Sequence, residues 1–157
     1  LKACELYFSQ AIIWVKEHPV LTRKDFMGNH EWCFYGWREG AAHVYLGPNN
    51  AVDVWSVKKI NPNKMVHLTE KPVELAVRAM QYSSRTGENV LDLFGGSGST
   101  LIAAHKVGRR GYLVELDPIY CDRIIRRYEA HAKDEAELIA RGEARNPRPP
   151  TAIEKAA

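Results

Sequence analysis

A glycine-rich stretch, "LDLFGGSGST" at residues 91–100, has residue types that could bind a nucleotide. Its glycines follow an apolar run and precede two hydroxyl residues, which predicts a tight loop between a strand and a helix. Glycines let a backbone approach a ligand closely, and the free N–H groups at a helix start attract anionic groups. The pattern therefore predicts a nucleotide-binding loop.

Two common phosphate-binding loops do not fit this stretch. A P-loop needs a Lys after its last glycine, and Gly98 is followed by Ser99. A dinucleotide loop needs a third glycine further on, where this chain has Leu101. Nucleoside triphosphates and dinucleotides are therefore disfavoured.

Two acidic residues narrow the ligand further. Asp92 stands just before the turn, and Glu115 follows Gly95 by 20 residues, where a carboxylate can accept hydrogen bonds from ribose hydroxyls. Such a pair favours a cationic ligand that carries an adenosine, which is the character of S-adenosylmethionine (AdoMet). A tight turn beside a solvent-exposed acid, or another nucleotide-binding α/β enzyme, stays open as an alternative.

The elements that would position these residues form a βαβα unit of a parallel sheet. We expect a strand over 89–94, a helix over 99–108, a strand over 110–117 and a helix over 118–142, whose arginines 123, 126 and 127 form a solvated face. Upstream, we expect strands at 10–16, 31–37, 42–46 and 52–57, then a helix over 72–84 that Pro72 begins.

Composition places few limits on function. The 157 residues carry a formal net charge of +3, and no apolar run reaches the roughly 20 residues of a membrane helix. The three cysteines lack metal-binding spacing, which predicts free thiols in a reducing compartment and no metal site. We therefore expect a cytoplasmic protein of bacterial or phage type that associates with the nucleoid and not with membranes.

Longer stretches carry a family resemblance. "HLTEKPVELAVRAM" and "ENVLDLFGGSGSTLIAAHKVGRRGYLVELDPIYCDRIIRRYE" closely resemble the carboxyl half of DNA amino-methyltransferases of the permuted β class, and the resemblance covers roughly residues 9–129. It implies an α/β fold: a Rossmann-like AdoMet-dependent methyltransferase sheet with flanking helices, incomplete in this chain. The implied activity is site-specific methylation of the exocyclic amine of adenine or cytosine in double-stranded DNA, as in restriction-modification systems.

The resemblance also assigns the cofactor site. Glu115 would hold the ribose hydroxyls, while Ser99 and Thr100 would cap the helix and bond the cofactor carboxylate. Three residues before the first helix of this region would line the methionine side: Thr69, Lys71 and Pro72. The remaining expected AdoMet contacts are Asp92, Phe94, Gly95, Gly96, Ser97 and Gly98.

One family motif is absent. These enzymes carry an Asp/Asn/Ser-Pro-Pro-Tyr/Phe tetrapeptide that holds the target amine, and no such tetrapeptide occurs here, so no catalytic residue is assigned. We expect the chain, which begins with Leu1, to be a portion of an enzyme and inactive alone. The strand at 89–93 would lose a neighbour, which an upstream or separate polypeptide or a homodimer would supply. A non-catalytic AdoMet- or DNA-binding module, a split or decayed methyltransferase half, is the alternative.

The expected organisation follows from these matches. Residues 1–16 would end the catalytic subdomain with one central strand, and 17–66 would form outer strands and a short target-recognition segment. Residues 67–132 would bind AdoMet, and 133–157 would be a helix end and a flexible tail. Six cations could contact DNA phosphates: Lys16, Arg23, Lys24, Arg38, Lys58 and Lys59.

Overall fold

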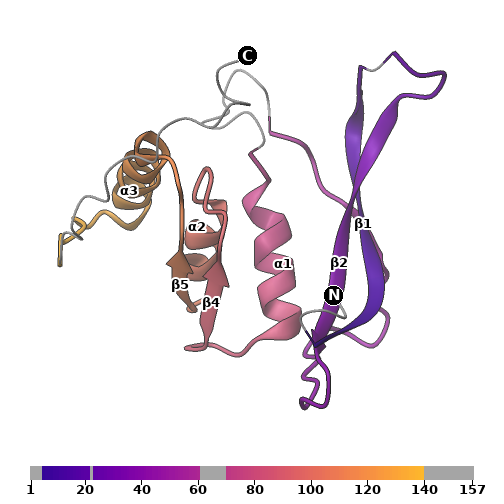
Figure 1. The fold of residues 1–157 in the computed structure, drawn as a ribbon, viewed down its shortest axis with the longest axis horizontal. Coiled ribbons are helices and arrows are strands. Elements are labelled where there is room, and N and C mark those ends of the chain that lie inside the picture. The colour runs from indigo at the N-terminus through magenta and orange to yellow at the C-terminus, as the bar shows by residue number, and fades with distance from the viewer. Residues whose placement is uncertain (1–4, 22, 61–69, 140–157) are drawn as a thin grey trace, which may run out of the picture.

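The computed structural model describes residues 5–21, 23–60 and 70–139. The chain forms a long hairpin, a connecting helix and a βαβα unit, as Figure 1 shows. The elements are, in order, β1 (Leu6–Val20), β2 (Gly28–Arg38), β3 (Val54–Ser56), α1 (Val73–Ser83), β4 (Asn89–Asp92), α2 (Ser99–Lys106), β5 (Arg110–Leu113) and α3 (Pro118–Ala132).

The predicted βαβα unit is confirmed. β4 and β5 pair in parallel, with Asn89 opposite Arg110 and Asp92 opposite Leu113. Helix α2 crosses between them and packs against α1, where Met80, Ala103 and Ala104 form a small buried core. The small alanines let the two helices approach closely, which brings α1 next to the strand–loop–helix unit.

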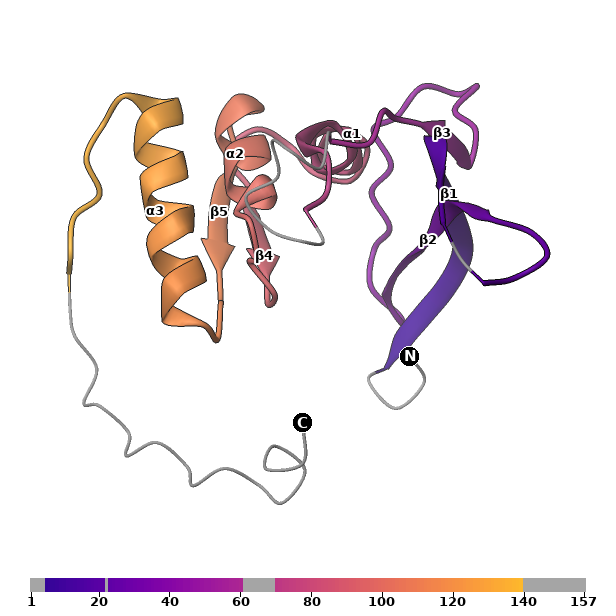
Figure 2. The same ribbon diagram turned by 90° about the horizontal axis from the view of Figure 1, so that it is seen from above.

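The hairpin forms a separate sheet. β1 and β2 are antiparallel, and β3 joins the other edge of β1 in parallel, which gives the order β2-β1-β3. Trp14 on β1 is buried, and its indole N–H donates to the carbonyl oxygen of Val57 at 2.7 Å. Viewed from above, α1 lies between the hairpin sheet and the β4–β5 pair (Figure 2).

Two expected elements differ in the structure. The segment 42–46 is not a strand; it is a loop that is held to the end of α1, where the N–H of Leu46 donates to the carbonyl oxygen of Tyr82. The helix expected over 118–142 ends at Ala132, because Lys133 adopts a left-handed backbone (φ 58°) that a helix cannot continue. The expectations for residues 140–157 lie outside the described residues.

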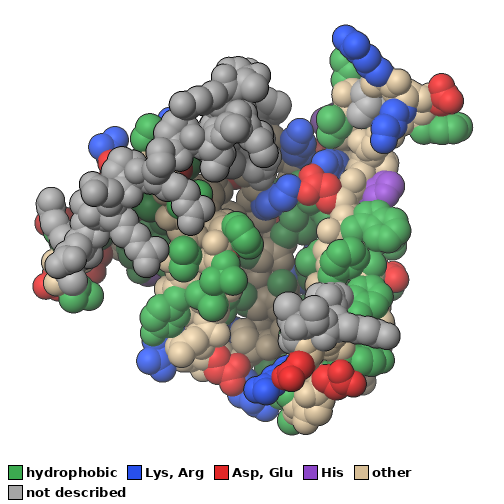
Figure 3. Space-filling model, viewed as in Figure 1, with side chains coloured by type: hydrophobic (Ala, Val, Ile, Leu, Met, Phe, Trp, Pro, Cys, Tyr) green, Lys and Arg blue, Asp and Glu red, His purple; other side chains and the backbone are tan. Residues whose placement is uncertain are grey.

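Within the described residues, β4 has a single partner strand, β5, as expected from the missing motif. β1 is central only in its own sheet and shares no ladder with β4. Leu91 and Tyr112, which face each other across the β4–β5 pair, are 65% and 52% exposed. Figure 3 shows apolar side chains gathered on this face of the molecule. A parallel sheet is normally covered on both faces, so this face lacks one of its layers.

Candidate functional site

The glycine loop follows β4 and is held against α3. Gly98 has a left-handed backbone (φ 75°) and is the N-cap residue of α2. A Cβ atom at this position would lie 3.1 Å from Cγ2 of Ile124 on α3, closer than most real Cβ contacts. Both the backbone angle and the close approach therefore require glycine here.

Asp92 braces the loop from within. Its carboxylate accepts hydrogen bonds from the backbone N–H of Phe94 at 2.9 Å and from the Thr100 hydroxyl at 2.6 Å. The expectation that Ser99 and Thr100 cap the helix is wrong, because the N-cap residue is Gly98 and no side chain caps it. The Thr100 hydroxyl points back to Asp92 instead, since that carboxylate is a stronger acceptor close by.

Glu115 connects the loop with the start of α3. One carboxylate oxygen accepts from the Gly96 N–H at 2.7 Å, and the other accepts from the N–H groups of Leu116 and Asp117 at 2.8 and 3.0 Å. Asp117 then caps α3 by accepting from the Ile119 N–H. The structure thus places the two predicted acids on either side of the same loop.

A buried ion pair that the sequence analysis missed fixes the far side of the loop. Arg127 on α3 donates to the carbonyl oxygen of Ser97 at 2.8 Å and pairs with Glu70 at 2.6 Å. The Glu70 side chain is only 3% exposed. Arg127 therefore does not belong to a solvated arginine face. Its helical spacing gave no such signal, because the pairing joins segments 57 residues apart.

A second charged cluster lies where the hairpin faces α1. The Glu31 carboxylate accepts from Lys16 and from Lys71, each at 2.6 Å. Both ammonium groups lie over the Trp14 ring, at 5.2 and 5.7 Å from its centroid. Burial raises the pKa of Glu31, but the hydrogen bonds and charges of Lys16 and Lys71 outweigh it, so the pKa of Glu31 lies below its ordinary value.

These groups surround one cavity of about 460 Å³, within the range of small-molecule sites. Nine of the predicted cofactor-binding residues line it: Lys71, Pro72, Asp92, Phe94, Gly95, Gly96, Ser97, Ser99 and Thr100. Gly98 and Glu115 do not line it, although both hold the loop that does, and Thr69 lies outside the described residues. The opposite wall contains Trp14, Glu31 and Trp32, which the sequence analysis did not assign to the site.

The structure separates the six predicted DNA-binding cations. Lys16 is 7% exposed and held by Glu31, a placement that argues against a phosphate contact. Arg23 and Lys24 lie in the exposed turn between β1 and β2, and Lys58 and Lys59 follow β3. Arg38 ends β2 at the other end of the hairpin, where it pairs with Glu5. They do not form one continuous patch.

Metal clusters and membrane spans are both absent from the described ranges. Across residues 5–21, 23–60 and 70–139, no group of three or more His, Cys, Asp or Glu side chains is arranged to hold a metal ion. In the part of the chain that the structure describes, no helix has the length and apolarity to cross a membrane.

Sequence comparison identifies relatives of this chain. The sequence model of the DNA methylase family matches residues 2–127. The Type II methyltransferase M.BglII from Bacillus subtilis is 23% identical, over 71% of this chain and 39% of that protein. The Type II methyltransferase M2.DpnII from Streptococcus pneumoniae is 35% identical, over 50% of this chain and 30% of that protein. The chain thus spans well under half the length of these relatives.

Solved structures share the fold. A complex of M1.HpyAVI with SAM, 23% identical, superposes with a TM-score of 0.70 over 80% of this chain and 64% of that chain. TTHA0409 from Thermus thermophilus, titled a DNA modification methylase in complex with S-adenosyl-L-methionine, is 26% identical with a TM-score of 0.62, over 83% of this chain and 56% of its own. The family match covers most of the sequence, and its fold agrees with that of DNA methyltransferases. The chain therefore belongs to the DNA methylase family of N6-adenine and N4-cytosine methyltransferases.

Proposed function

We propose that this chain is the AdoMet-binding portion of a DNA methyltransferase that transfers a methyl group to the exocyclic amine of adenine or cytosine. The observation that carries the proposal is the cavity in which Asp92, the glycine loop and Lys71 meet, beside Glu115. The matched relatives are methyltransferases by name, and two matched structures hold the same cofactor by title.

The residues of this cavity suit AdoMet. Asp92 keeps acceptor capacity beyond its two hydrogen bonds, because a carboxylate offers about four lone-pair sites, and it would orient the ammonium group of the methionine end. Lys71, half-exposed, has donors beyond its bond to Glu31 that could meet the cofactor carboxylate. Glu115 would accept from the ribose hydroxyls, and the exposed Phe94 would cover the bound molecule. When bound, AdoMet supplies an electrophilic methyl group.

Calorimetry with AdoMet tests this site. Asp92→Ala and Glu115→Ala are each expected to weaken binding at least tenfold, since each removes charge-assisted hydrogen bonds worth about 1.5–3 kcal/mol. Asp122→Ala is the matched control, because Asp122 is an exposed acid on α3 outside the cavity. Undiminished affinity in both site variants would overturn the cofactor assignment.

We further propose that the catalytic tetrapeptide comes from another polypeptide or another part of the protein and completes the sheet beside β4. Two findings support this: β4 has one partner strand in the described part of the chain, and the face of Leu91 and Tyr112 is exposed. Unpaired strand edges and uncovered sheet faces are costly. A homodimer that pairs two such edges is the competing arrangement.

Methylation assays separate these possibilities. Labelled AdoMet and unmodified double-stranded DNA are incubated with this chain alone, and then with the upstream region added. We expect transfer only in the second case, and activity of the chain alone would refute the need for a supplied motif. Digestion of the product to nucleosides then distinguishes N6-methyladenine from N4-methylcytosine. AdoMet binding without methylation in either mixture would favour the non-catalytic module, which the missing tetrapeptide already makes the second candidate.

A further inference from the structure

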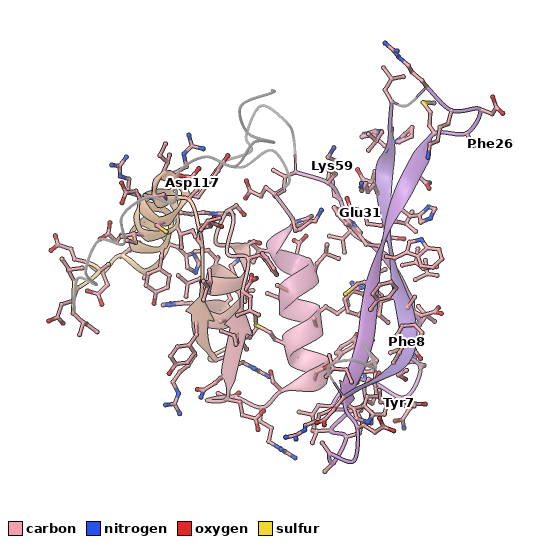
Figure 4. The ribbon with its side chains drawn as sticks, in the orientation of Figure 1. Tyr7, Phe8, Phe26, Glu31, Lys59 and Asp117 are labelled. Atoms are coloured by element: carbon pink, nitrogen blue, oxygen red, sulfur yellow. The ribbon has the colours of Figure 1, made fainter. Side chains whose placement is uncertain are left out.

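The turn between β1 and β2 exposes apolar side chains that nothing in the described structure covers. Phe26 is 89% exposed and Leu21 is 87% exposed, and Met27 beside them is also exposed. Figure 4 shows Phe26 at the far end of the hairpin, away from the helices. Covering a side chain of this size typically stabilises a structure by about 1.5–3 kcal/mol, so a cluster of them at a protruding turn suggests a binding partner.

The charges of the same turn indicate what kind of partner it meets. Arg23 and Lys24 are exposed within it, and Asp25 is its single acid. Lys59 lies toward the same end of the molecule in Figure 4. The neighbouring acid Glu17 is already paired with Lys58 at 3.2 Å. Apolar tips flanked by a net positive charge complement a polyanion that also has an apolar interior, and stacked DNA bases between phosphate rows have this character.

The path of the chain aims the turn at the end where the cavity opens. From Val15 opposite His30 to Val20 opposite Gly28, five steps on β1 face two on β2. A bulge of this kind bends the hairpin and turns side chains out of register, and Lys16 within it points to Glu31 in the cavity wall. Figures 1 and 4 place the hairpin turn at the same end of the molecule as Glu31 and the loop that follows β4.

We propose that this turn is a DNA-contacting wedge: Phe26 inserts against a base step of the duplex while Arg23 and Lys24 bind the flanking phosphates. The inference rests on the proposed function, because it assumes DNA as the partner, and it adds where and how the duplex is held. Apolar wedges of this type unstack a step and bend the duplex, and the phosphate contacts offset part of that cost. A duplex held there would lie across the mouth of the cavity.

The test uses the full 157-residue chain and a short duplex that carries 2-aminopurine, a base whose fluorescence rises when it is unstacked. We expect wild-type chain to raise the fluorescence and Phe26→Ala to abolish the rise while affinity falls by less than about tenfold. Arg23→Gln with Lys24→Gln should weaken binding at least tenfold at low salt, and should reduce the slope of log affinity against log salt by about 2. Phe8→Ala and Arg38→Gln, at the other end of the hairpin, are the matched controls and should change neither readout.

Three outcomes overturn the wedge. Phe26→Ala could match wild type in fluorescence and affinity, the cation variants could bind DNA undiminished, or the chain could bind anionic lipid vesicles in preference to duplex. Calorimetry with AdoMet on the same preparations keeps the two proposals apart. Loss of AdoMet binding with an intact DNA response rejects the cofactor assignment alone, and AdoMet binding without any DNA response rejects the wedge alone. The turn is remote from the buried core, so circular dichroism should show all variants folded.

Discussion

Replacing Gly98 with alanine is expected to lower the free energy of unfolding by about 2–3 kcal/mol. The left-handed backbone at φ 75° costs an alanine roughly 1–2 kcal/mol, of which the stiffer unfolded chain returns a few tenths to 1 kcal/mol. The new methyl group would also lie 3.1, 3.3 and 3.5 Å from Cγ2, Cγ1 and Cβ of Ile124, a crowding that adds about 1–2 kcal/mol because Ile124 is buried.

Gly87 provides the matched control for this prediction. It has a similar backbone (φ 84°), but a Cβ atom there would meet nothing within 4 Å, so Gly87→Ala should cost only about 1 kcal/mol. Urea unfolding followed by far-ultraviolet circular dichroism measures both variants, with the slope against urea required to stay constant. In an Ile124→Ala background, the cost of Gly98→Ala should fall to the Gly87 value. Equal costs for both glycines in the wild-type background would refute the contact with α3.

Three further predictions concern the charged pairs. Arg127→Gln should lower the free energy of unfolding by about 2–3 kcal/mol, because buried Glu70 loses its arginine, whereas exposed Arg126→Gln should change it by less than about 0.5 kcal/mol; equal effects in urea unfolding would contradict the pairing. Arg127→Gln should also weaken AdoMet binding severalfold in calorimetry, since the Ser97 carbonyl is released, and unchanged affinity would show that the loop holds itself. Glu31→Gln should destabilise at neutral pH. The pKa of Glu31 is lowered by folding, so its contribution is complete above the ordinary glutamate pKa of about 4.3 and is lost as pH falls through the folded value. The stability gap between wild type and this variant should therefore shrink in acid, and a gap that is constant with pH would refute the charge pairing.

Local signals predicted the cofactor half of the site well. Apolar runs, Gly98 and the proline before α3 are decided within a few residues, so the strand, loop, helix and strand order from Asn89 could be predicted without tertiary contacts. The acid Glu115 also followed from the fixed length of a βαβ unit, which brings the two strand ends together. The end of α3 could not be predicted in this way, because Lys133 in a left-handed conformation has no distinctive sequence signal.

The sequence by itself therefore determined the βαβα unit, the loop and its two acids, and the absence of the catalytic tetrapeptide. Tertiary structure alone decided that Lys16 turns inward to Glu31, that Arg127 anchors Ser97, and that Phe26 projects from the hairpin turn. The reason is physical: periodicity and turn chemistry act over a few residues, whereas ion pairs and exposure depend on how distant segments pack. A lysine, an arginine or a phenylalanine is compatible with either environment until that packing is known.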